Sequence, residues 1–396
     1  MENKKTILFL TSRFPFPLEK GDKLRAYHQI KELSSSYHII LCSLTLTKIK
    51  QEWLNELTPF CQNIHTFKLN KFFIFINIIK SFFSGKPFQI GYFFQRKIKK
   101  QIQAVIKNQQ PDFIYCQLIR TTEYVKNIHS IPKVLDYMDA LSMGMEKRAE
   151  IANLIKKAIF KFEGARLKNY ENKIFDYFDH HTIISQQDQK LIAHPSNQKI
   201  TIVPNGVGSY FTEFDSSKIE KEYDVVFVGN LNYPPNVECC LFIINDILPI
   251  FNANEIELNV LLSGANPSSK ILKHGNHNNI TITGWVDDIR LSYVKGKIFI
   301  APLFIGTGLQ NKLLEAMSLN TPCITTSLAN NALGAQPNSE ILIANNPNEF
   351  YNAINQLLNN ANLAKEITLK ANDFVNKKYN WHRATYKIPF IPTKVS

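Results

Sequence analysis

The sequence lacks the cysteine and histidine spacing that metal sites and redox motifs require. Six cysteines occur among 396 residues, but none forms a C-x-x-C pair and none lies near histidines at zinc-ligand spacing. This pattern excludes a zinc finger and indicates a reducing, cytoplasmic setting.

Also missing is an apolar run of membrane-spanning length. The longest run, FFIFINIIKSFF at 72–83, is interrupted by Asn77 and Lys80 and is shorter than the roughly 20 residues that a spanning helix needs. The apolar run at 6–11 follows a charged start, but no small-residue cleavage site comes after it, so we interpret it as a first strand. The sequence therefore predicts no transmembrane segment.

Acidic residues are missing from residues 57–111, which contain nine Lys or Arg interleaved with phenylalanines. Residues 1–200 contain 31 Lys and Arg against 17 Asp and Glu, a net charge of +14, whereas residues 201–396 carry −1. A cationic, aromatic segment predicts peripheral contact with an anionic membrane at its inner face. The alternative places the phenylalanines in the core and the lysines on a solvated face. No nucleic-acid partner is expected, because aromatic-basic RNA motifs are missing.

Short β-rich runs alternate with longer helical patterns, which is typical of parallel sheets with helices on both faces. In the first half these runs lie at 6–11, 38–44, 113–116, 133–136 and 181–185. In the second half they lie at 224–229, 258–264, 280–284, 298–302, 322–326 and 341–344. We therefore predict an α/β chain with two Rossmann-like, doubly wound domains, 1–200 and 201–378, that face a central cleft. The segment 379–396 is expected to pack back on the first domain.

The segment IFIAPLFIGTGLQNKLLEAM in the second half carries the clearest chemical signal. A strand leads to a turn with Gly306 and Gly308, and then to a helix expected over about 309–319. Glycines let the backbone approach a ligand, and unpaired N–H groups at a helix start suit phosphate. Lys312 adds a cation in the first turn, and Glu315 on the same face offers a carboxylate to ribose hydroxyls. The alternative is a capped surface helix with an ion pair.

In the first half, the loop SRFPFPLEKGDKLRAYH also places a glycine, Gly21, before a helix start that suits phosphate. Other polar residues follow strands at the carboxyl edge, where open α/β sheets bind ligands. The candidate acceptor-side residues are Arg25, His28, Arg120, Asp136 and Asp139. His28 equally suits a packed or surface position, and no general base can be named.

Taken in order, these motifs resemble glycosyltransferase family 4, the retaining GT-B enzymes. The glycine-lysine-glutamate motif of that family appears as Gly306, Gly308, Lys312 and Glu315, followed by PCITT at 322–326. Other matching pieces are FLTSRFPFPLEKGDKLRAYH at 9–28, SQQD at 185–188, PNGV at 204–207, FVGNLNYPPN at 227–236 and GWVDDIR at 284–290. The resemblance runs from about residue 6 to 385 and is strongest to exopolysaccharide-associated sugar transferases.

The resemblance implies a hexosyltransferase that moves a sugar from a nucleotide-sugar donor to a lipid-linked or polysaccharide acceptor in cell-surface glycan synthesis. The leaving phosphate then helps to take the acceptor proton, so no metal and no cofactor are expected. By this resemblance Glu315 holds the ribose and Lys312 holds the diphosphate. From their position after a strand, either Asp136 or Asp139 could orient the acceptor. The other implied donor contacts are Gly21, Gly229, Asn230, Val286, Gly306, Thr307, Gly308, Leu309 and Gln310.

The sequence departs from the family pattern at three positions. The family commonly has a first glutamate where this chain has Thr307, and an Arg and a Lys where it has Asn230 and Pro235. Loss of these cations leaves Lys312 as the visible charge for the leaving diphosphate. A catalytically weak or inactive nucleotide-sugar-binding protein is therefore an alternative. A nucleotide-sugar epimerase is another, although its set of acid and base residues is not evident.

Overall fold

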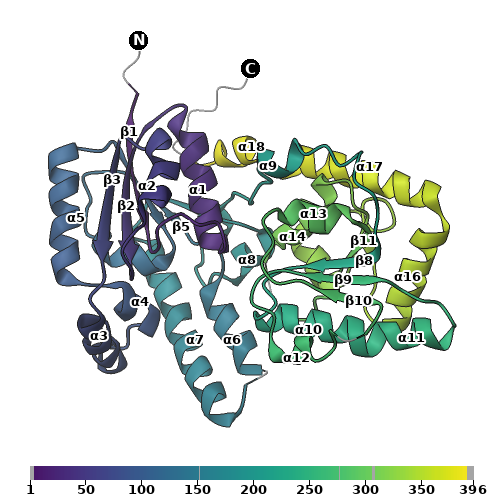
Figure 1. Ribbon diagram of the computed structural model, residues 1–396. Helices are drawn as coiled ribbons and strands as arrows, with labels where there is room; N and C mark the ends of the chain where they lie inside the picture. The colour runs from purple at the N-terminus through teal and green to yellow at the C-terminus, as the bar shows by residue number, and fades with distance from the viewer. Residues whose placement is uncertain (1–3, 151, 276, 306–307, 390–396) are drawn as a thin grey trace. The chain divides into compact units, whose positions relative to one another are not determined.

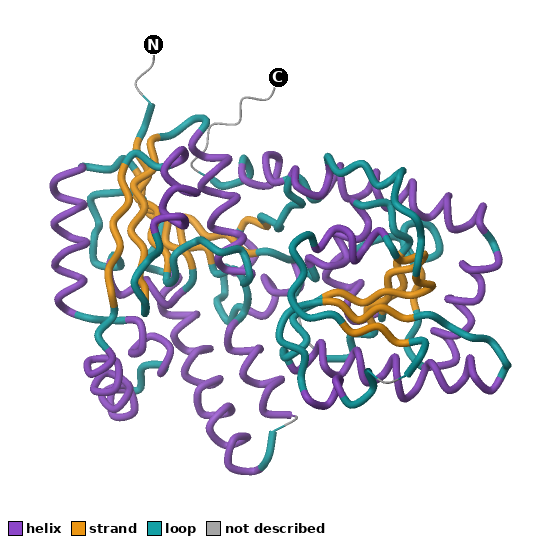
Figure 2. Tube along the Cα trace, in the orientation of Figure 1, coloured by secondary structure: helices purple, strands orange, loops and turns teal. Residues whose placement is uncertain are grey.

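The computed structural model describes residues 4–150, 152–275, 277–305 and 308–389. The chain divides into two compact units, residues 1–204 with 381–396 (unit 1) and residues 205–380 (unit 2). Each unit is a parallel sheet flanked by helices on both faces (Figures 1 and 2). The predicted α/β class is therefore confirmed within each unit.

The sheet of unit 1 has the strand order β3-β2-β1-β4-β5-β6-β7. Its strands are β1 (Thr6–Thr11), β2 (His38–Thr45), β3 (Asn63–Lys68), β4 (Phe113–Gln117), β5 (Lys133–Asp136), β6 (His180–Ile183) and β7 (Thr201–Ile202). Its helices are α1 (Gly21–Ser34), α2 (Gln51–Leu57), α3 (Lys71–Ser84), α4 (Phe88–Phe93), α5 (Arg96–Gln109), α6 (Leu141–Glu150), α7 (Leu154–Phe175), α8 (Gln186–Leu191) and α18 (Trp381–Thr385).

The sheet of unit 2 has the order β10-β9-β8-β11-β12-β13. Its strands are β8 (Tyr223–Val228), β9 (Val260–Ser263), β10 (Ile280–Ile282), β11 (Gly296–Ala301), β12 (Cys323–Thr325) and β13 (Leu342–Ile343). Its helices are α9 (Ser209–Thr212), α10 (Pro234–Phe242), α11 (Leu248–Ala253), α12 (Ser269–Leu272), α13 (Ile289–Val294), α14 (Asn311–Ser318), α15 (Ser327–Leu333), α16 (Pro347–Asn359) and α17 (Ala361–Lys378).

Alternation along β1 explains why unit 1 needs helices on both faces of its sheet. Ile7 and Phe9 belong to the core that α1 and α2 cover, whereas Leu8 and Leu10 belong to the core that α5 and α7 cover. Side chains that point to opposite faces of a strand are all buried only when both faces are covered. The continuous apolar run therefore dictates a three-layer arrangement.

The edge strand β3 was missing from the sequence prediction. Its sequence, NIHTFK, contains only two apolar residues, Ile64 and Phe67, and only Phe67 is buried in it. Strands at a sheet edge are covered less completely than central ones, so the apolar signal on which the prediction relied is weak there.

One helical run, Pro234–Ala253, is long and apolar enough to cross a membrane by length and composition. It comprises α10, a π-helical turn at Ile243–Ile247 and α11. Half of its most apolar window is buried, and Cys240, Ile247 and Phe251 lie in the core of unit 2. The helix therefore owes its apolar character to the domain core.

A buried ion pair joins α1 to the central strand β5. Arg25 donates from Nε to Oδ2 of Asp136 at 2.7 Å and from Nη2 to Oδ1 at 3.0 Å, and both side chains have no exposed surface. Arg25 Nη1 donates to the carbonyl oxygen of Val203, and Thr182 donates to Asp136. Because both charged groups are enclosed and satisfied, the predictions that Arg25 and Asp136 contact an acceptor are wrong.

The C-terminal helix α18 packs on α1 within unit 1. The ring of His28 stacks on Trp381 with 4.8 Å between centroids, and Ser36 lies 3.0 Å from the Tyr386 hydroxyl. Burial lowers the pKa of His28 to about 4, with a smaller contribution from Lys31. His28 is therefore neutral, half-buried and packed against Trp381 on one ring face, and its contact with an acceptor stays a prediction.

We expect Arg25→Ala or Asp136→Asn to reduce the free energy of unfolding of unit 1 by about 3–5 kcal/mol, because each leaves a buried charge unpaired. Trp285→Phe provides a background in which the remaining tryptophans, Trp53 and Trp381, both lie in unit 1. Urea denaturation followed by tryptophan fluorescence measures the loss.

The exposed pair Lys50 and Glu52 in unit 1 supplies the matched control for this measurement. Because it lies at the start of α2 and is solvated, Glu52→Gln should change stability by less than about 1 kcal/mol. A loss below 1 kcal/mol in both buried-pair variants contradicts the interpretation.

Candidate functional site

Lys312 and Glu315 lie on α14 in unit 2, which begins one residue after Gln310. The helix is shorter than the predicted 309–319 and spans Asn311–Ser318. Lys312 Nζ donates to Oδ1 of Asn236 at 2.5 Å and lies 4.7 Å from the ring centroid of Phe227. Glu315 accepts a 2.6 Å hydrogen bond from Tyr293. Each charged group is thus positioned by a neutral partner, which argues against a surface helix with an ion pair.

Burial governs the charge state of both groups. It lowers the pKa of Lys312, opposed by the nearby Cys239, Cys240 and Glu315. It also raises the pKa of Glu315, opposed by the hydrogen bond from Tyr293 and by the charge of Lys312. A cation whose hydrogen-bond partner is an amide keeps its charge available to an incoming anion.

Two glycines, Gly229 after β8 and Gly264 after β9, make room for this arrangement at the carboxyl ends of these strands. A Cβ on Gly229 would lie 2.7 Å from Asn236 Nδ2 and 3.2 Å from Lys312 Nζ. Gly264 has φ +141°, and a Cβ there would lie 1.8 Å from the carbonyl oxygen of Gly229. Neither position tolerates a side chain without displacement of its neighbours.

The other predicted donor contacts occupy the loops around these helices. Asn230 accepts a hydrogen bond from Asn236 through its carbonyl oxygen, and Gly308 has φ +91°. Leu309, Gln310 and Val286 are half-buried, and Gly306 and Thr307 lie outside the described residues. Gly21 starts α1 in unit 1, and a Cβ there would meet no atom within 4 Å.

Asn236 and Tyr293 were missing from the predicted site. Asn236 lies in the first turn of α10, within the stretch FVGNLNYPPN that already stood out in the sequence. Tyr293 sits in α13 among apolar residues, where periodicity indicates a core position. Only the fold reveals that its hydroxyl meets Glu315.

Asp288 has a local role in unit 2. It caps α13 by accepting a hydrogen bond from the backbone N–H of Arg290, and it pairs with the Arg290 guanidinium. The hydroxyl of Tyr210 donates to the same carboxylate at 2.8 Å. Among the described residues, no group of three or more His, Cys, Asp or Glu has the geometry of a metal site.

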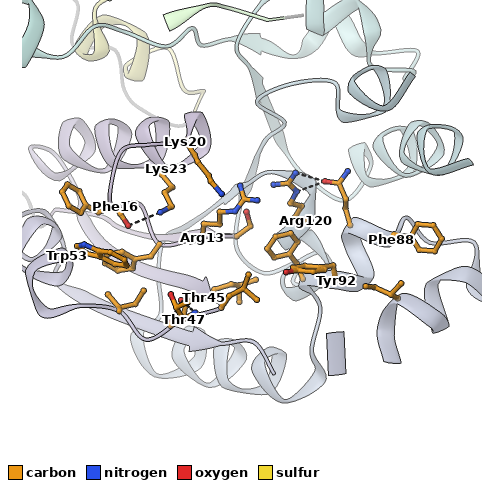
Figure 3. Close-up of a pocket in the computed structure, with 18 residues that line it drawn as sticks. Arg13, Phe16, Lys20, Lys23, Thr45, Thr47, Trp53, Phe88, Tyr92 and Arg120 are labelled. Carbon is orange, nitrogen blue, oxygen red and sulfur yellow. Dashed lines mark hydrogen bonds between the residues drawn. The ribbon is translucent and has the colours of Figure 1, made fainter. Parts of the chain in front are cut away.

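In unit 1, a pocket of about 490 Å³ opens at the carboxyl ends of β1, β2 and β4 (Figure 3). The predicted residue Arg120 lines it together with three further cations, Arg13, Lys20 and Lys23, that the prediction did not assign. The sheet order reverses between β1 and β4, and parallel sheets bind ligands at such switch points. The pocket is therefore a candidate binding site within unit 1.

Asp139 follows β5 and is half-buried. The preceding residue, Met138, has φ +61°, a strained conformation for a side chain of this size. Burial, reinforced by Asp188, raises the pKa of Asp139 to about 7. Because this pKa lies near neutrality, the carboxyl group can accept or donate a proton at physiological pH.

Residues 222–360 match the family model for Glycosyl transferases group 1. An uncharacterized 44.6 kDa protein in the cps region of Klebsiella pneumoniae is 23% identical over 394 residues, covering 94% of this chain and 96% of that protein. These two similarities support a glycosyltransferase.

Several solved structures share the whole architecture. Sucrose-phosphate synthase from Thermosynechococcus elongatus has a TM-score of 0.68 at 13% identity and covers 98% of both chains. HepE from Anabaena, solved with UDP and glucose, has a TM-score of 0.65 at 12% identity, covering 98% of this chain and 99% of that chain. The predicted GT-B fold is confirmed.

We expect the wild type to lose stability relative to Asp139→Asn as the pH rises from about 4 to about 7. The folded-state pKa is about 7, above the ordinary value of 3.8, so the stabilising protonated form is lost as the pH rises through this window. Thermal unfolding of both proteins between pH 4 and 8 measures the difference.

Asp215→Asn is the control for the sign of this effect. Hydrogen bonds from Ser217 lower the pKa of Asp215. The stabilisation that the ionised Asp215 carboxylate gives the folded state is therefore lost as the pH falls. A stability difference for Asp139→Asn that does not change between pH 4 and 8 argues against a raised pKa.

Proposed function

Because the chain carries a glycosyl transferases group 1 domain and has the GT-B fold, we propose that it transfers a hexose from a nucleotide-sugar donor with retention of configuration. The observation that carries this proposal is the pairing of Lys312 with a neutral amide beside Glu315 on α14. The acceptor is a lipid-linked or polysaccharide glycan, in keeping with the cps region that encodes the Klebsiella relative.

Glu315 and Lys312 divide donor recognition between them. The Glu315 carboxylate accepts hydrogen bonds from the ribose hydroxyls while Tyr293 holds its other side. Lys312 Nζ donates to Asn236. The residue before Asn236 is Pro235, and at the position of Pro235 the resembled family carries a cation. The helix lysine thus supplies positive charge beside the loop where cations are missing, and it stabilises the leaving diphosphate.

The reaction requires little acid-base chemistry from the protein. The bond from the sugar C1 to the diphosphate oxygen breaks as the acceptor oxygen bonds to C1 on the same face. The acceptor proton passes to the leaving phosphate. Asp139, with a pKa near 7, accepts a hydrogen bond from the acceptor hydroxyl and orients it. No metal or cofactor takes part in this scheme.

A cytoplasmic enzyme with a lipid-linked acceptor must reach the membrane, and unit 1 carries a surface suited to this. The α3–α7 face consists of exposed apolar residues on α3 and on the first half of α7. They are Phe72, Phe73, Phe75, Ile79, Phe82, Phe83, Leu154, Ile155, Ile159 and Phe162.

The two helices of the α3–α7 face are in contact. The ring centroids of Phe82 and Phe162 lie 5.8 Å apart, and Arg166 donates to the carbonyl oxygen of Phe82. Ile155 and Ile159 continue from Phe162 along one side of α7 at helical spacing. The apolar surface therefore extends across both helices, beyond the predicted segment 57–111.

The positive charge of the lysines on this face favours an anionic lipid surface as its partner. Exposed lysines on it include Lys71, Lys80, Lys156 and Lys161. Helix α3 has no acidic residue, and the acidic residues of α7, Glu163 and Glu171, are buried. Each lysine near an anionic bilayer contributes about 1 kcal/mol, and the phenylalanines add apolar insertion.

We expect Glu315→Gln and Lys312→Met each to weaken nucleoside diphosphate binding by about 10-fold or more, because each removes a charge-assisted hydrogen bond to the donor. Calorimetric titration with UDP, GDP, ADP and CDP measures the dissociation constants.

Glu366→Gln, on the exposed face of α17, is the matched control and should bind as the wild type does. The donor proposal fails if no nucleoside diphosphate binds the wild type, or if the α14 variants bind it unchanged.

We expect Phe83→Ser combined with Ile155→Ser to abolish flotation with phosphatidylglycerol vesicles, because both side chains are among the most exposed on the α3–α7 face. Lys80→Glu combined with Lys161→Glu should weaken flotation by at least 10-fold, since about 1 kcal/mol is lost per lysine.

The matched controls for flotation are Leu369→Ser and Lys365→Glu on α17 of unit 2, where Leu369 is 60% exposed. Equal flotation of all variants, or equal binding to neutral phosphatidylcholine, argues against the membrane surface. Self-association that the Phe83 and Ile155 changes abolish assigns the face to a second copy of the chain instead.

A further inference from the structure

The pocket of unit 1 has an unusual distribution of charge. Its cations are Arg13, Lys20, Lys23 and Arg120, and no Asp or Glu lines it. Figure 3 shows all four side chains along one side of the pocket. Asp22 does not line the pocket, but its Oδ2 lies 2.7 Å from Nη1 of Arg13 and forms an ion pair with it. Only part of the positive charge of the pocket is therefore neutralised.

Arg120 is held by an amide and not by a carboxylate. Its Nε and Nη2 both donate to Oε1 of Gln89, at 2.9 and 2.7 Å, and this partner is a neutral amide. Within the described part of the chain, no carboxylate lies within ion-pair distance of Arg120. Burial, with Arg13 nearby, lowers its pKa to about 10, as expected for a cation that lacks a counter-ion.

Lys23 is held in a similar way. Its Nζ donates to the carbonyl oxygen of Phe16 and lies 5.9 Å from the ring centroid of Trp53. Backbone carbonyls and aromatic faces orient an ammonium group without cancelling its charge. The cationic side chains of the pocket are therefore oriented without being neutralised, and an anionic ligand would pair with them.

The rest of the lining is mostly apolar and aromatic, with Ser12, Thr45, Thr47 and Gln89 as its polar members. Phe16 and Trp53 lie toward one end, and Phe88 and Tyr92 toward the other, while Ile49 and Ile78 also line the pocket. Ile78 belongs to α3 and Phe88 to α4, and the ring centroid of Phe88 lies 6.0 Å from that of Phe162 on the α3–α7 face. The apolar wall of the pocket thus adjoins the exposed apolar surface.

We propose that this pocket binds the acceptor as an amphipathic phosphate ester. Arg13, Lys20, Lys23 and Arg120 hold its phosphate or diphosphate, and the aromatic walls hold the attached apolar chain. The assignment rests on the proposed transferase function and specifies its acceptor class. A phosphate group between several cations gains charge-assisted hydrogen bonds, while a hydrocarbon chain gains burial in a cavity of about 490 Å³.

The test uses the full chain and three probes: farnesyl diphosphate, farnesol and inorganic diphosphate. Calorimetric titration should show farnesyl diphosphate binding at least 10-fold more tightly than either of the others, because only this probe uses both the cations and the apolar walls. Equal binding of farnesol overturns the anion site. Equal binding of inorganic diphosphate overturns the apolar part and assigns the pocket to free phosphates.

Arg120→Gln and Lys20→Glu should each weaken farnesyl diphosphate binding by about 10-fold or more. Lys20 is exposed, so its variant tests the pocket without disturbing the fold. Lys31→Gln removes an exposed cation of α1 that does not line the pocket, and this variant should bind farnesyl diphosphate as the wild type does. Unchanged binding in both pocket variants overturns the proposal.

Nucleoside diphosphate binding, measured on the same preparations, separates the two proposals. Nucleotide binding without farnesyl diphosphate binding overturns the pocket assignment and supports the donor site. Lys312→Met should weaken nucleotide binding alone, and an equal loss of farnesyl diphosphate affinity would show that the probe binds at α14 and overturn the pocket assignment.

Discussion

The buried pair between Arg25 and Asp136 is the constraint on which unit 1 depends. A bidentate guanidinium and carboxylate, both without exposed surface, link α1 to β5, and the carbonyl of Val203 is tied to the same arginine. Because such a pair resists any change in geometry, it fixes the start of α1 relative to the sheet. The loop before α1 carries Lys20, and the first turn carries Lys23, so the walls of the basic pocket inherit this position.

Both candidate sites hold a cation by means of a neutral amide. Asn236 orients Lys312 in unit 2, and Gln89 orients Arg120 in unit 1. A carboxylate partner would have neutralised each cation, whereas an amide fixes its direction and leaves its charge for a ligand. The diphosphate donor and the phosphorylated acceptor that we propose would each pair with one of these cations.

The charge asymmetry of the sequence has a structural counterpart. The net charge of +14 belongs to residues 1–200, and part of it lies in the basic pocket and in the lysines around the α3–α7 face. Helix α3 contributes Ile78 to the pocket and phenylalanines to the exposed surface. Helix α3 thus borders the pocket on one side and carries exposed apolar residues on others, which explains why its sequence is apolar nearly all round.

The sequence alone determined the α/β class, the central strands and the glycine-lysine-glutamate segment, because these depend on local periodicity and short spacing. It did not reveal β3, whose edge position leaves a weak apolar signal. Tertiary structure decided which polar residues face a ligand. Arg25 is fully enclosed and paired with Asp136, and His28 stacks on Trp381. Asn236 and Tyr293 reach the site only because distant segments converge. Such partners are separated by 22 to 111 positions in the chain, and no local pattern records which of them meet.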